Sequence, residues 1–320
     1  MTKRIHTNFG LLAILLWSTT VAVTRSMSEQ VGPLTAACAV YLFGGGLSVT
    51  YLLVRGQLFT PGEALSRRYL LGCGSLFVIY MIAFYAAMGA AASRQQVLEV
   101  GLVNYLWPTL TLLFSMPLLN KRPSLLLLPG MLLASAGVFL VATQNTTVSW
   151  AGFADNLHSN PSAYAFALVA AVSWGFYSNL SRRWAEGVNS NAVTGFMLAT
   201  GLVLLALLWW FPEKSVWTLR VVLEIVFMGV ATALSYVFWD IAMRKGDMVL
   251  VTSCSYLTPF LATLVACYYL DVGAGWKLWA GCVLIIAGAV LAKKSLTPKE
   301  VHHARSLPHR QAPQVLPGKV

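Results

Sequence analysis

Long apolar segments alternate with short polar ones along most of the chain. Ten of these segments hold about 20 residues each, which is enough for a helix to cross the roughly 30 Å hydrocarbon core of a bilayer. They cover residues 9–28, 33–54, 70–91, 97–118, 124–143, 161–182, 189–211, 218–243, 248–270 and 275–293. The pattern predicts an all-α membrane protein with ten transmembrane helices.

Composition agrees with this interpretation. The chain has 320 residues, of which 58% are hydrophobic and only 10% are charged, and its mean hydropathy is +0.69. Soluble domains carry roughly 25% charged residues. The first segment lacks a small-residue cleavage site, so we expect a retained helix rather than a signal peptide.

The polar stretches between the segments divide the chain into parts. Most connections are short, which favours antiparallel neighbours, but a longer polar link lies in the middle and a tail rich in Pro, His, Lys and Arg lies at the end. Such a tail is typical of disorder. The expected parts are a first five-helix repeat (1–143), an extracytoplasmic connecting loop (144–160), a second five-helix repeat (161–294) and a disordered basic tail (295–320).

The basic residues predict the orientation. If ten segments cross the membrane, 17 of the 22 Lys and Arg residues fall on the side of the N-terminus and 5 on the other side. Without the tail the ratio is 11 to 5. Basic loops stay in the cytoplasm, so both termini are expected there. The net charge of +11 is then a matter of topology, and nucleic acid is not an expected partner.

Short motifs of the first half recur in the second half. Leu16-Trp17-Ser18 resembles Ser173-Trp174-Gly175 after 157 positions, while Asn104-Tyr105-Leu106-Trp107-Pro108 resembles Ser255-Tyr256-Leu257-Thr258-Pro259, and Gly130 and Gly137 match Gly281 and Gly288, both after 151 positions. Five spans per half is an odd number, so the two halves must have opposite orientations. Inverted repeats of this kind are typical of secondary transporters, which bind substrate between the halves near the midplane.

Pro108 and Pro259 mark the most informative helices. A proline inside a helix removes a backbone donor and crowds the carbonyl four residues earlier, so the helix must kink or open. A broken helix at matching places of both halves predicts a transport site with gating positions at these two prolines.

Three tryptophans lie deep inside their segments. Trp17, Trp107 and Trp174 fall eight to fourteen residues from a predicted end, roughly at mid-membrane at 1.5 Å per residue. An indole N–H has no partner in lipid at that depth, so these rings are expected to face protein or a cavity. Trp239 is a candidate for the cavity from the second half but lies nearer a segment end. The remaining tryptophans lie near segment ends, where an interfacial belt explains them.

Further side chains join them as candidates for binding substrate. By the same argument they include Tyr80, Tyr85, Tyr105, Tyr177 and Tyr256, together with the amides of Asn104 and Asn179. The amides have an alternative role, since they also bond one helix to another. On a regular helix Tyr105 and Trp107 point nearly 200° apart, so both can face one pocket only if Pro108 re-aims the turn. In the second half Thr258 replaces Trp107, so the first half is expected to supply more of the aromatic contacts.

Ionisable residues are scarce inside the segments. Glu99 lies just inside the fourth segment, where it is expected to pair with Arg94 or guard the external mouth, and Asp240 and Arg244 have the i,i+4 spacing of a surface ion pair. A midplane carboxylate is missing, which disfavours proton or sodium antiport. All histidines lie outside the segments, and no catalytic, metal-binding or nucleotide-binding motif is present. We therefore expect neither an enzyme nor a cofactor or bound metal.

The two five-helix repeats and the proline-bearing fourth and ninth segments resemble the drug/metabolite transporter superfamily over residues 9–295. Within its EamA-type ten-helix exporters, Leu16-Trp17-Ser18 and Asn104-Tyr105-Leu106-Trp107-Pro108 are similar to the YddG-type aromatic amino acid exporters. The resemblance implies a monomeric protein of the cell inner membrane that exports aromatic amino acids by alternating access, as a uniporter. The alternative is a proton-coupled antiporter of drugs or other metabolites. A receptor or structural protein would not need two inverted halves.

Overall fold

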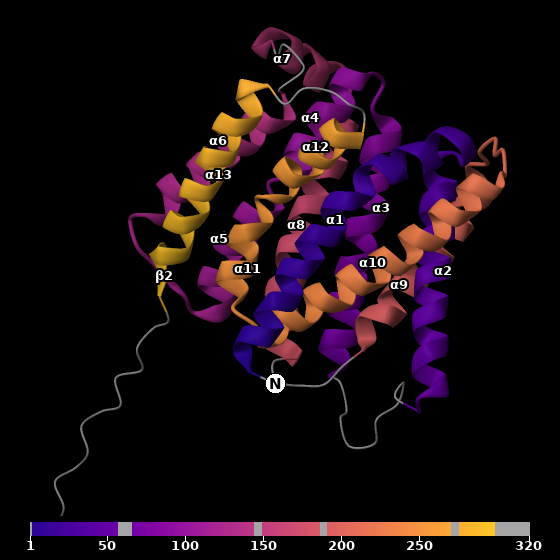
Figure 1. Ribbon diagram of the computed structural model, residues 1–320, viewed down its shortest axis with the longest axis horizontal. Coiled ribbons are helices and arrows are strands. Elements are labelled where there is room, and N and C mark those ends of the chain that lie inside the picture. The colour runs from indigo at the N-terminus through magenta and orange to yellow at the C-terminus, as the bar shows by residue number, and fades with distance from the viewer. Residues whose placement is uncertain (1, 57–65, 144–148, 186–190, 270–274, 298–320) are drawn as a thin grey trace, which may run out of the picture.

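The computed structural model describes residues 2–56, 66–143, 149–185, 191–269 and 275–297, and nearly all of its regular structure is helical (Figure 1). The helices are α1 (Lys3–Val31), α2 (Pro33–Val54), a π-helical turn (Arg68–Cys73), α3 (Gly74–Ala90), α4 (Arg94–Asn104), α5 (Trp107–Leu119), α6 (Leu127–Ala142), α7 (Trp150–Ser159), α8 (Pro161–Ala185), α9 (Ala192–Trp210), α10 (Leu219–Lys245), α11 (Met248–Ser255), α12 (Thr258–Tyr269) and α13 (Trp276–Ser295). Two short strands, β1 (Arg122–Pro123) and β2 (Leu296–Thr297), pair antiparallel.

Each of the ten apolar segments contains a helix or a pair of helices. The fourth and ninth segments are both divided, into α4 with α5 and α11 with α12. One helix is additional, because α7 lies in the stretch 144–160 that was predicted as a loop. Of the predicted basic tail 295–320, all residues after 297 lie outside the described part.

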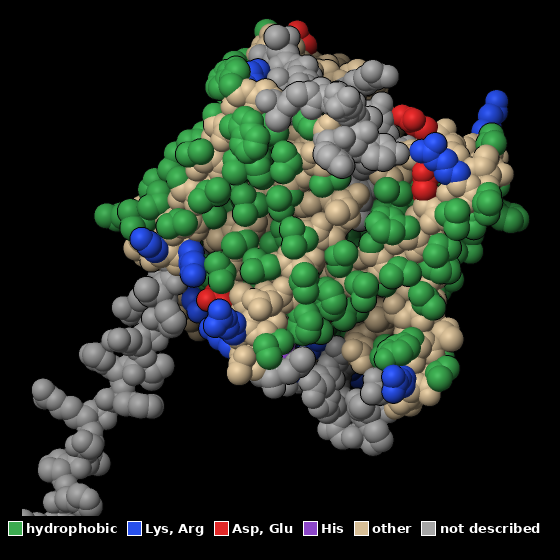
Figure 2. Space-filling view, in the orientation of Figure 1, with side chains coloured by type: hydrophobic (Ala, Val, Ile, Leu, Met, Phe, Trp, Pro, Cys, Tyr) green, Lys and Arg blue, Asp and Glu red, His purple; other side chains and the backbone are tan. Residues whose placement is uncertain are grey.

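The helices have the length and surface of a membrane protein. Within the described residues, seven helices are long and apolar enough to cross a membrane when Gln95–Leu119, which covers α4 and α5, counts as one of them. The number is eight when α11 and α12, bent by 43°, also count as one span. Apolar side chains cover the middle of the face shown in Figure 2, and charged side chains gather towards its ends. This distribution matches a belt of lipid between two aqueous surfaces.

Contacts between the helices follow a two-fold pattern. The most extensive contacts join α6 with α13, α1 with α10, α2 with α9, and α3 with α8. If each helix is exchanged for its counterpart in the other half, the first-with-eighth contact of α1 and α10 becomes the third-with-sixth contact of α3 and α8. The other two pairs map onto themselves. The main helix contacts are therefore unchanged when the two halves are exchanged.

Glycines allow the closest of these contacts, between α6 and α13. An ideal Cβ on Gly137 would lie 2.6 Å from the carbonyl oxygen of Gly281, and one on Gly281 would lie 2.7 Å from that of Gly137. Seven residues away along each helix, a Cβ on Gly288 would lie 2.5 Å from the carbonyl oxygen of Gly130. Rising numbers on α6 meet falling numbers on α13, so these corresponding helices run antiparallel, as inverted halves require.

We expect Gly137→Ala to destabilise the protein. The added methyl group meets backbone rather than a flexible side chain, and overpacking of this kind costs about 1–3 kcal/mol. The measurement is the apparent melting temperature in detergent, with Gly46→Ala as control because a Cβ there meets nothing within 4 Å. Equal melting temperatures for the two variants would contradict the glycine contact.

The segment between α9 and α10 fixes the turn between α1 and α2. The Glu213 carboxylate accepts hydrogen bonds from the amides of Leu34 (3.1 Å) and Thr35 (2.7 Å) at the start of α2. The Ser215 hydroxyl donates to the Val31 carbonyl at 2.7 Å. An anionic group satisfies the free N–H groups of a helix start, so this contact ties the two halves together at the end of the molecule away from the N-terminus.

Candidate functional site

The two proline-bearing helices break in the same way. α4 ends at Asn104, four residues before Pro108, and α11 ends at Ser255, four residues before Pro259. The carbonyls of Asn104 and Ser255 are those that a proline four residues later leaves without a donor. In both cases a two-residue turn follows, and the next helix starts one residue before the proline.

The three deep tryptophans come together at the first break. The ring centroids of Trp17, Trp107 and Trp174 lie 6.0–6.4 Å apart, with interplanar angles of 70–82°. Edge-to-face contacts at this distance match the quadrupoles of aromatic rings. The three rings come from α1, α5 and α8, so the cluster spans both halves.

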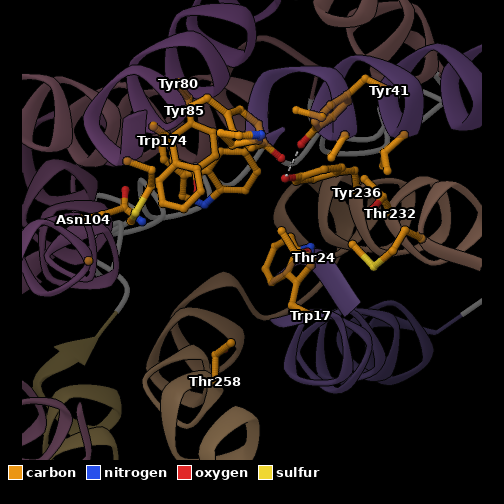
Figure 3. A pocket seen from close by; sticks show the side chains of 18 of the residues that line it. Trp17, Thr24, Tyr41, Tyr80, Tyr85, Asn104, Trp174, Thr232, Tyr236 and Thr258 are labelled. Carbon is orange, nitrogen blue, oxygen red and sulfur yellow. Dashed lines mark hydrogen bonds between the residues drawn. The ribbon is translucent and has the colours of Figure 1, made fainter. Parts of the chain in front are cut away.

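A cavity of about 360 Å³ begins at this cluster, a volume in the range of small-molecule sites. Its lining comprises Trp17, Thr24, Met27, Pro33, Ala36, Ala37, Val40, Tyr41, Tyr80, Phe84, Tyr85, Met88, Gly101, Asn104, Tyr105, Trp107, Trp174, Met228, Thr232, Tyr236 and Thr258. Figure 3 shows many of these side chains around the opening. The lining runs from the tryptophans to the α1–α2 turn and the end of α3, so the cavity extends away from the N-terminus.

Most of the predicted site residues lie around this cavity. The lining contains Trp17, Tyr80, Tyr85, Asn104, Tyr105, Trp107 and Trp174. Tyr105 and Trp107 both line the cavity, because the break at Tyr105 and Leu106 interrupts the regular helix that would point them apart. Among the described lining residues, Trp174 and Tyr236 are the aromatic ones from the second half, so the aromatic surface comes mostly from the first half.

Three predicted residues lie outside the lining. The Tyr177 hydroxyl donates to Asp240 Oδ1 at 3.3 Å, and the Tyr256 hydroxyl lies 2.6 Å from Thr109 Oγ1. Asn179 Nδ2 donates to the carbonyls of Thr111 (2.9 Å) and Gly175 (2.8 Å). Asn179 thus joins α8 to α5, which is the alternative role of an amide inside a span.

The cavity is neutral and offers polar groups without partners. None of the described lining residues is charged. Within the described part of the chain, Asn104 Oδ1 accepts no hydrogen bond, and Thr258 Oγ1 neither accepts nor donates one. A buried polar atom without a partner costs free energy, and a ligand that bonds to it recovers that cost.

Two tyrosines of the lining were not among the predicted residues. Tyr41 of α2 and Tyr236 of α10 place their hydroxyl oxygens 3.0 Å apart. The depth argument that selected Trp17 applies equally to Tyr41, which lies eight residues inside α2. Tyr236 had no separate signal in the sequence, where Trp239, three residues later, was the candidate of this segment. Trp239 itself is fully buried behind Trp17 and Trp107, with ring centroids at 5.1 and 5.4 Å.

On the N-terminal side of the tryptophans lies a buried ion pair. Arg244 Nη2 lies 2.6 Å from Asp240 Oδ2, and both side chains are 1% exposed. The expectation of a surface pair was wrong, because Tyr69 and Tyr177 cover the carboxylate and donate to its Oδ1 at 3.2 and 3.3 Å. Spacing on one helix gives no information about which neighbours cover it.

Glu99 occupies the other end of the molecule. Its carboxylate is buried and accepts hydrogen bonds from Gln95 (2.9 Å), Asn156 (3.3 Å) and the Tyr164 hydroxyl. These contacts join α4 to α7 and α8. The side chain of Arg94, its expected partner, lies outside the described residues.

Comparisons with known proteins agree with this architecture. The model of the EamA-like transporter family matches residues 7–143 and again 161–293, so the family domain occurs twice. The aromatic amino acid exporter YddG of Escherichia coli K12 is 31% identical over 91% of this chain and 97% of its own length. YddG of Ancylobacter novellus is 33% identical over 91% of this chain and 98% of its own.

A more distant relative and a solved structure add to this. The uncharacterised inner membrane transporter YedA of Escherichia coli K12 is 27% identical over 80% of this chain and 81% of its own length. One crystal structure superposes with a TM-score of 0.74 at 31% identity, covering 90% of this chain and 96% of that one. The family model and the named relatives are transporters and not enzymes, and the chain belongs to the EamA-like transporter family of the drug/metabolite transporter superfamily.

Proposed function

We propose that this protein exports aromatic amino acids across the inner membrane by alternating access. The topology that goes with this proposal has ten spans in two inverted repeats, 1–143 and 161–294, joined by an extracytoplasmic segment 144–160, with both termini cytoplasmic. The twofold contact pattern and the antiparallel α6–α13 pair support the inversion. The distribution of basic residues supports the orientation.

The observation that carries the substrate class is the cavity wall. Trp17, Trp107 and Trp174 offer ring edges and faces to a flat aromatic group, and the YddG relatives are named as exporters of such amino acids. The wall has no charged side chain among the described residues, which suits a zwitterion with no net charge. A cationic drug would instead be expected to need a carboxylate in the wall.

Asn104 is the proposed site for the charged end of the substrate. Its Oδ1 lacks a hydrogen-bond donor among the described residues and suits an ammonium group. The start of α5 lies beside it, and interrupted helices present free backbone groups and a positive end to anionic groups. Pro108 thus contributes by keeping this break open, and Pro259 does the same in the other half.

In the proposed orientation the cavity faces outwards. The tryptophan cluster and the Asp240–Arg244 pair then close the cytoplasmic side, and the contacts of Glu99 and Glu213 lie at the outer end. Rocking of one repeat against the other would exchange the closed and open ends. This motion needs no energy source beyond the substrate gradient, so we propose a uniporter.

One observation favours the second candidate, a proton-coupled antiporter. Glu99 is buried, and only neutral donors contact its carboxylate among the described residues. Buried carboxylates in membrane proteins are where coupling protons bind.

Flux into liposomes with purified protein tests both candidates. We expect tryptophan and phenylalanine to move, a polar amino acid and a cationic dye to move at background rate, and a proton gradient to change nothing. Aromatic flux only against an opposing proton gradient would replace uniport by antiport. Flux of the dye without aromatic flux would overturn the substrate class.

A further inference from the structure

The cavity contains a pair of phenol groups whose hydrogen bonds are incomplete. Tyr41 and Tyr236 place their hydroxyl oxygens 3.0 Å apart, and the two oxygens lie 2.8 and 3.7 Å from Met81 Sδ. Each phenol has one proton to donate and two lone pairs. One proton bonds the two tyrosines together, and within the described part of the chain the other has only the thioether, a weak acceptor. The pair therefore keeps a donor and several lone pairs for a ligand.

Packing alone does not require this pair, because the positions equivalent to the two tyrosines hold other residues. Gly45 and Gly201 occupy equivalent positions. An ideal Cβ on Gly45 would lie 2.6 Å from the amide nitrogen of Leu198, three residues before Gly201. An ideal Cβ on Gly201 would lie 2.7 Å from the amide nitrogen of Leu42, three residues before Gly45. By that offset of 156, Tyr41 corresponds to Met197.

In the sequence, the stretch from Gly74 to Met88 aligns with the stretch from Gly229 to Met243 at an offset of 155, and Tyr236 then corresponds to Met81. The counterparts of the two tyrosines are thus two methionines, both buried. Methionines thus occupy the equivalent positions, whereas hydroxyls stand on the side that lines the cavity.

The pair also lies at the centre of the molecule. Tyr236 and its own counterpart Met81 are in contact, and two equivalent residues can meet only near the axis that relates the halves. Inverted-repeat transporters bind substrate in that region.

The position of the pair relative to Asn104 indicates which end of the substrate it meets. In Figure 3, Asn104 and the tyrosine pair lie on opposite sides of the aromatic group formed by Tyr80, Tyr85 and Trp174. An aromatic amino acid likewise has its charged head and the tip of its ring at opposite ends. With the head at Asn104, the ring stacks in the middle and its tip points towards the pair.

We infer that the Tyr41–Tyr236 hydroxyl pair hydrogen-bonds to the polar tip of the substrate ring and so determines specificity among aromatic amino acids. This inference rests on the proposed function. The phenol of tyrosine both donates and accepts, and the indole N–H of tryptophan donates, so each finds a partner in the pair. Phenylalanine has no polar tip and gains nothing from it.

The test measures efflux of tyrosine, tryptophan and phenylalanine from one proteoliposome preparation of each variant. For Tyr41→Phe, Tyr236→Phe and the double variant, we expect the tyrosine-to-phenylalanine and tryptophan-to-phenylalanine ratios to fall about three- to tenfold, the size of one or two neutral hydrogen bonds. Phenylalanine flux serves as internal standard, so the ratio does not depend on how much variant protein inserts. Tyr51→Phe is the matched control, because Tyr51 lies on the same helix and is 56% exposed.

The possible outcomes separate this inference from the proposed function. Ratios within twofold of the wild type would overturn the inference that the pair binds the ring tip. An equal loss of flux for all three amino acids would overturn it too and would assign the pair to the head group of the substrate. A wild-type protein that moves none of the three would overturn the proposed function and this inference with it. If the double variant fails to insert, the single variants give the same two ratios.

Discussion

Trp174→Ala is expected to reduce export of tryptophan and phenylalanine roughly 30-fold or more, the loss typical of a central aromatic anchor. Trp174 is 2% exposed and lies at the meeting point of the cavity wall. Its ring centroid is 4.6 Å from Tyr80, 6.0 Å from Trp17 and 6.2 Å from Trp107. Removal of the indole takes away one wall of the ring site and loosens the other two tryptophans. The same result is expected for Trp107→Ala.

Export must be measured alongside the amount of protein in the membrane, because truncating a buried tryptophan costs about 3–5 kcal/mol of stability. Trp209→Ala is the matched control, since Trp209 is 86% exposed on α9, and it should export normally. Trp174→Phe should recover part of the flux by restoring a ring. Normal export of both amino acids by Trp174→Ala would remove Trp174 from the site.

The sequence allowed most of the fold to be predicted, because each long apolar segment needs a helix to satisfy its backbone in lipid. Residues 33–54 agree with α2 to the residue. Helix α7 escaped this reasoning, since its ten residues are too few and too polar for a span. The breaks in the fourth and ninth segments were predictable from Pro108 and Pro259, whose missing N–H acts locally.

Site residues were predictable where the depth of a side chain in the membrane determines whether it faces the protein. They were not predictable where the direction of the side chain determines whether it reaches the cavity. Trp17, Trp107 and Trp174 must avoid lipid wherever their helices pack. Tyr177 lies one helical turn beyond Trp174, yet its hydroxyl reaches Asp240 instead of the cavity. The rotation of a helix about its axis depends on contacts with its neighbours, and Asp240 lies 63 positions from Tyr177 along the chain.

Asp240→Asn is expected to destabilise the protein strongly. Arg244 is 1% exposed, and the substitution removes the charge that its guanidinium pairs with at 2.6 Å. Breaking a buried ion pair in this way costs roughly 3–5 kcal/mol. The measurement is the apparent melting temperature of the purified protein in detergent, together with its yield from membranes.

The same helix provides the control for this prediction. Arg220 and Glu224 of α10 also form an i,i+4 pair, at 3.0 Å, but the arginine is 67% exposed, and exposed pairs contribute about 0–1 kcal/mol. Arg220→Gln should therefore change the melting temperature little. The double variant Asp240→Asn with Arg244→Met should recover most of the loss, because it removes both charges and keeps an oxygen for Tyr69 and Tyr177. A double variant as unstable as Asp240→Asn would show that the hydrogen bonds around Asp240, and not its charge, stabilise this closed end of the protein.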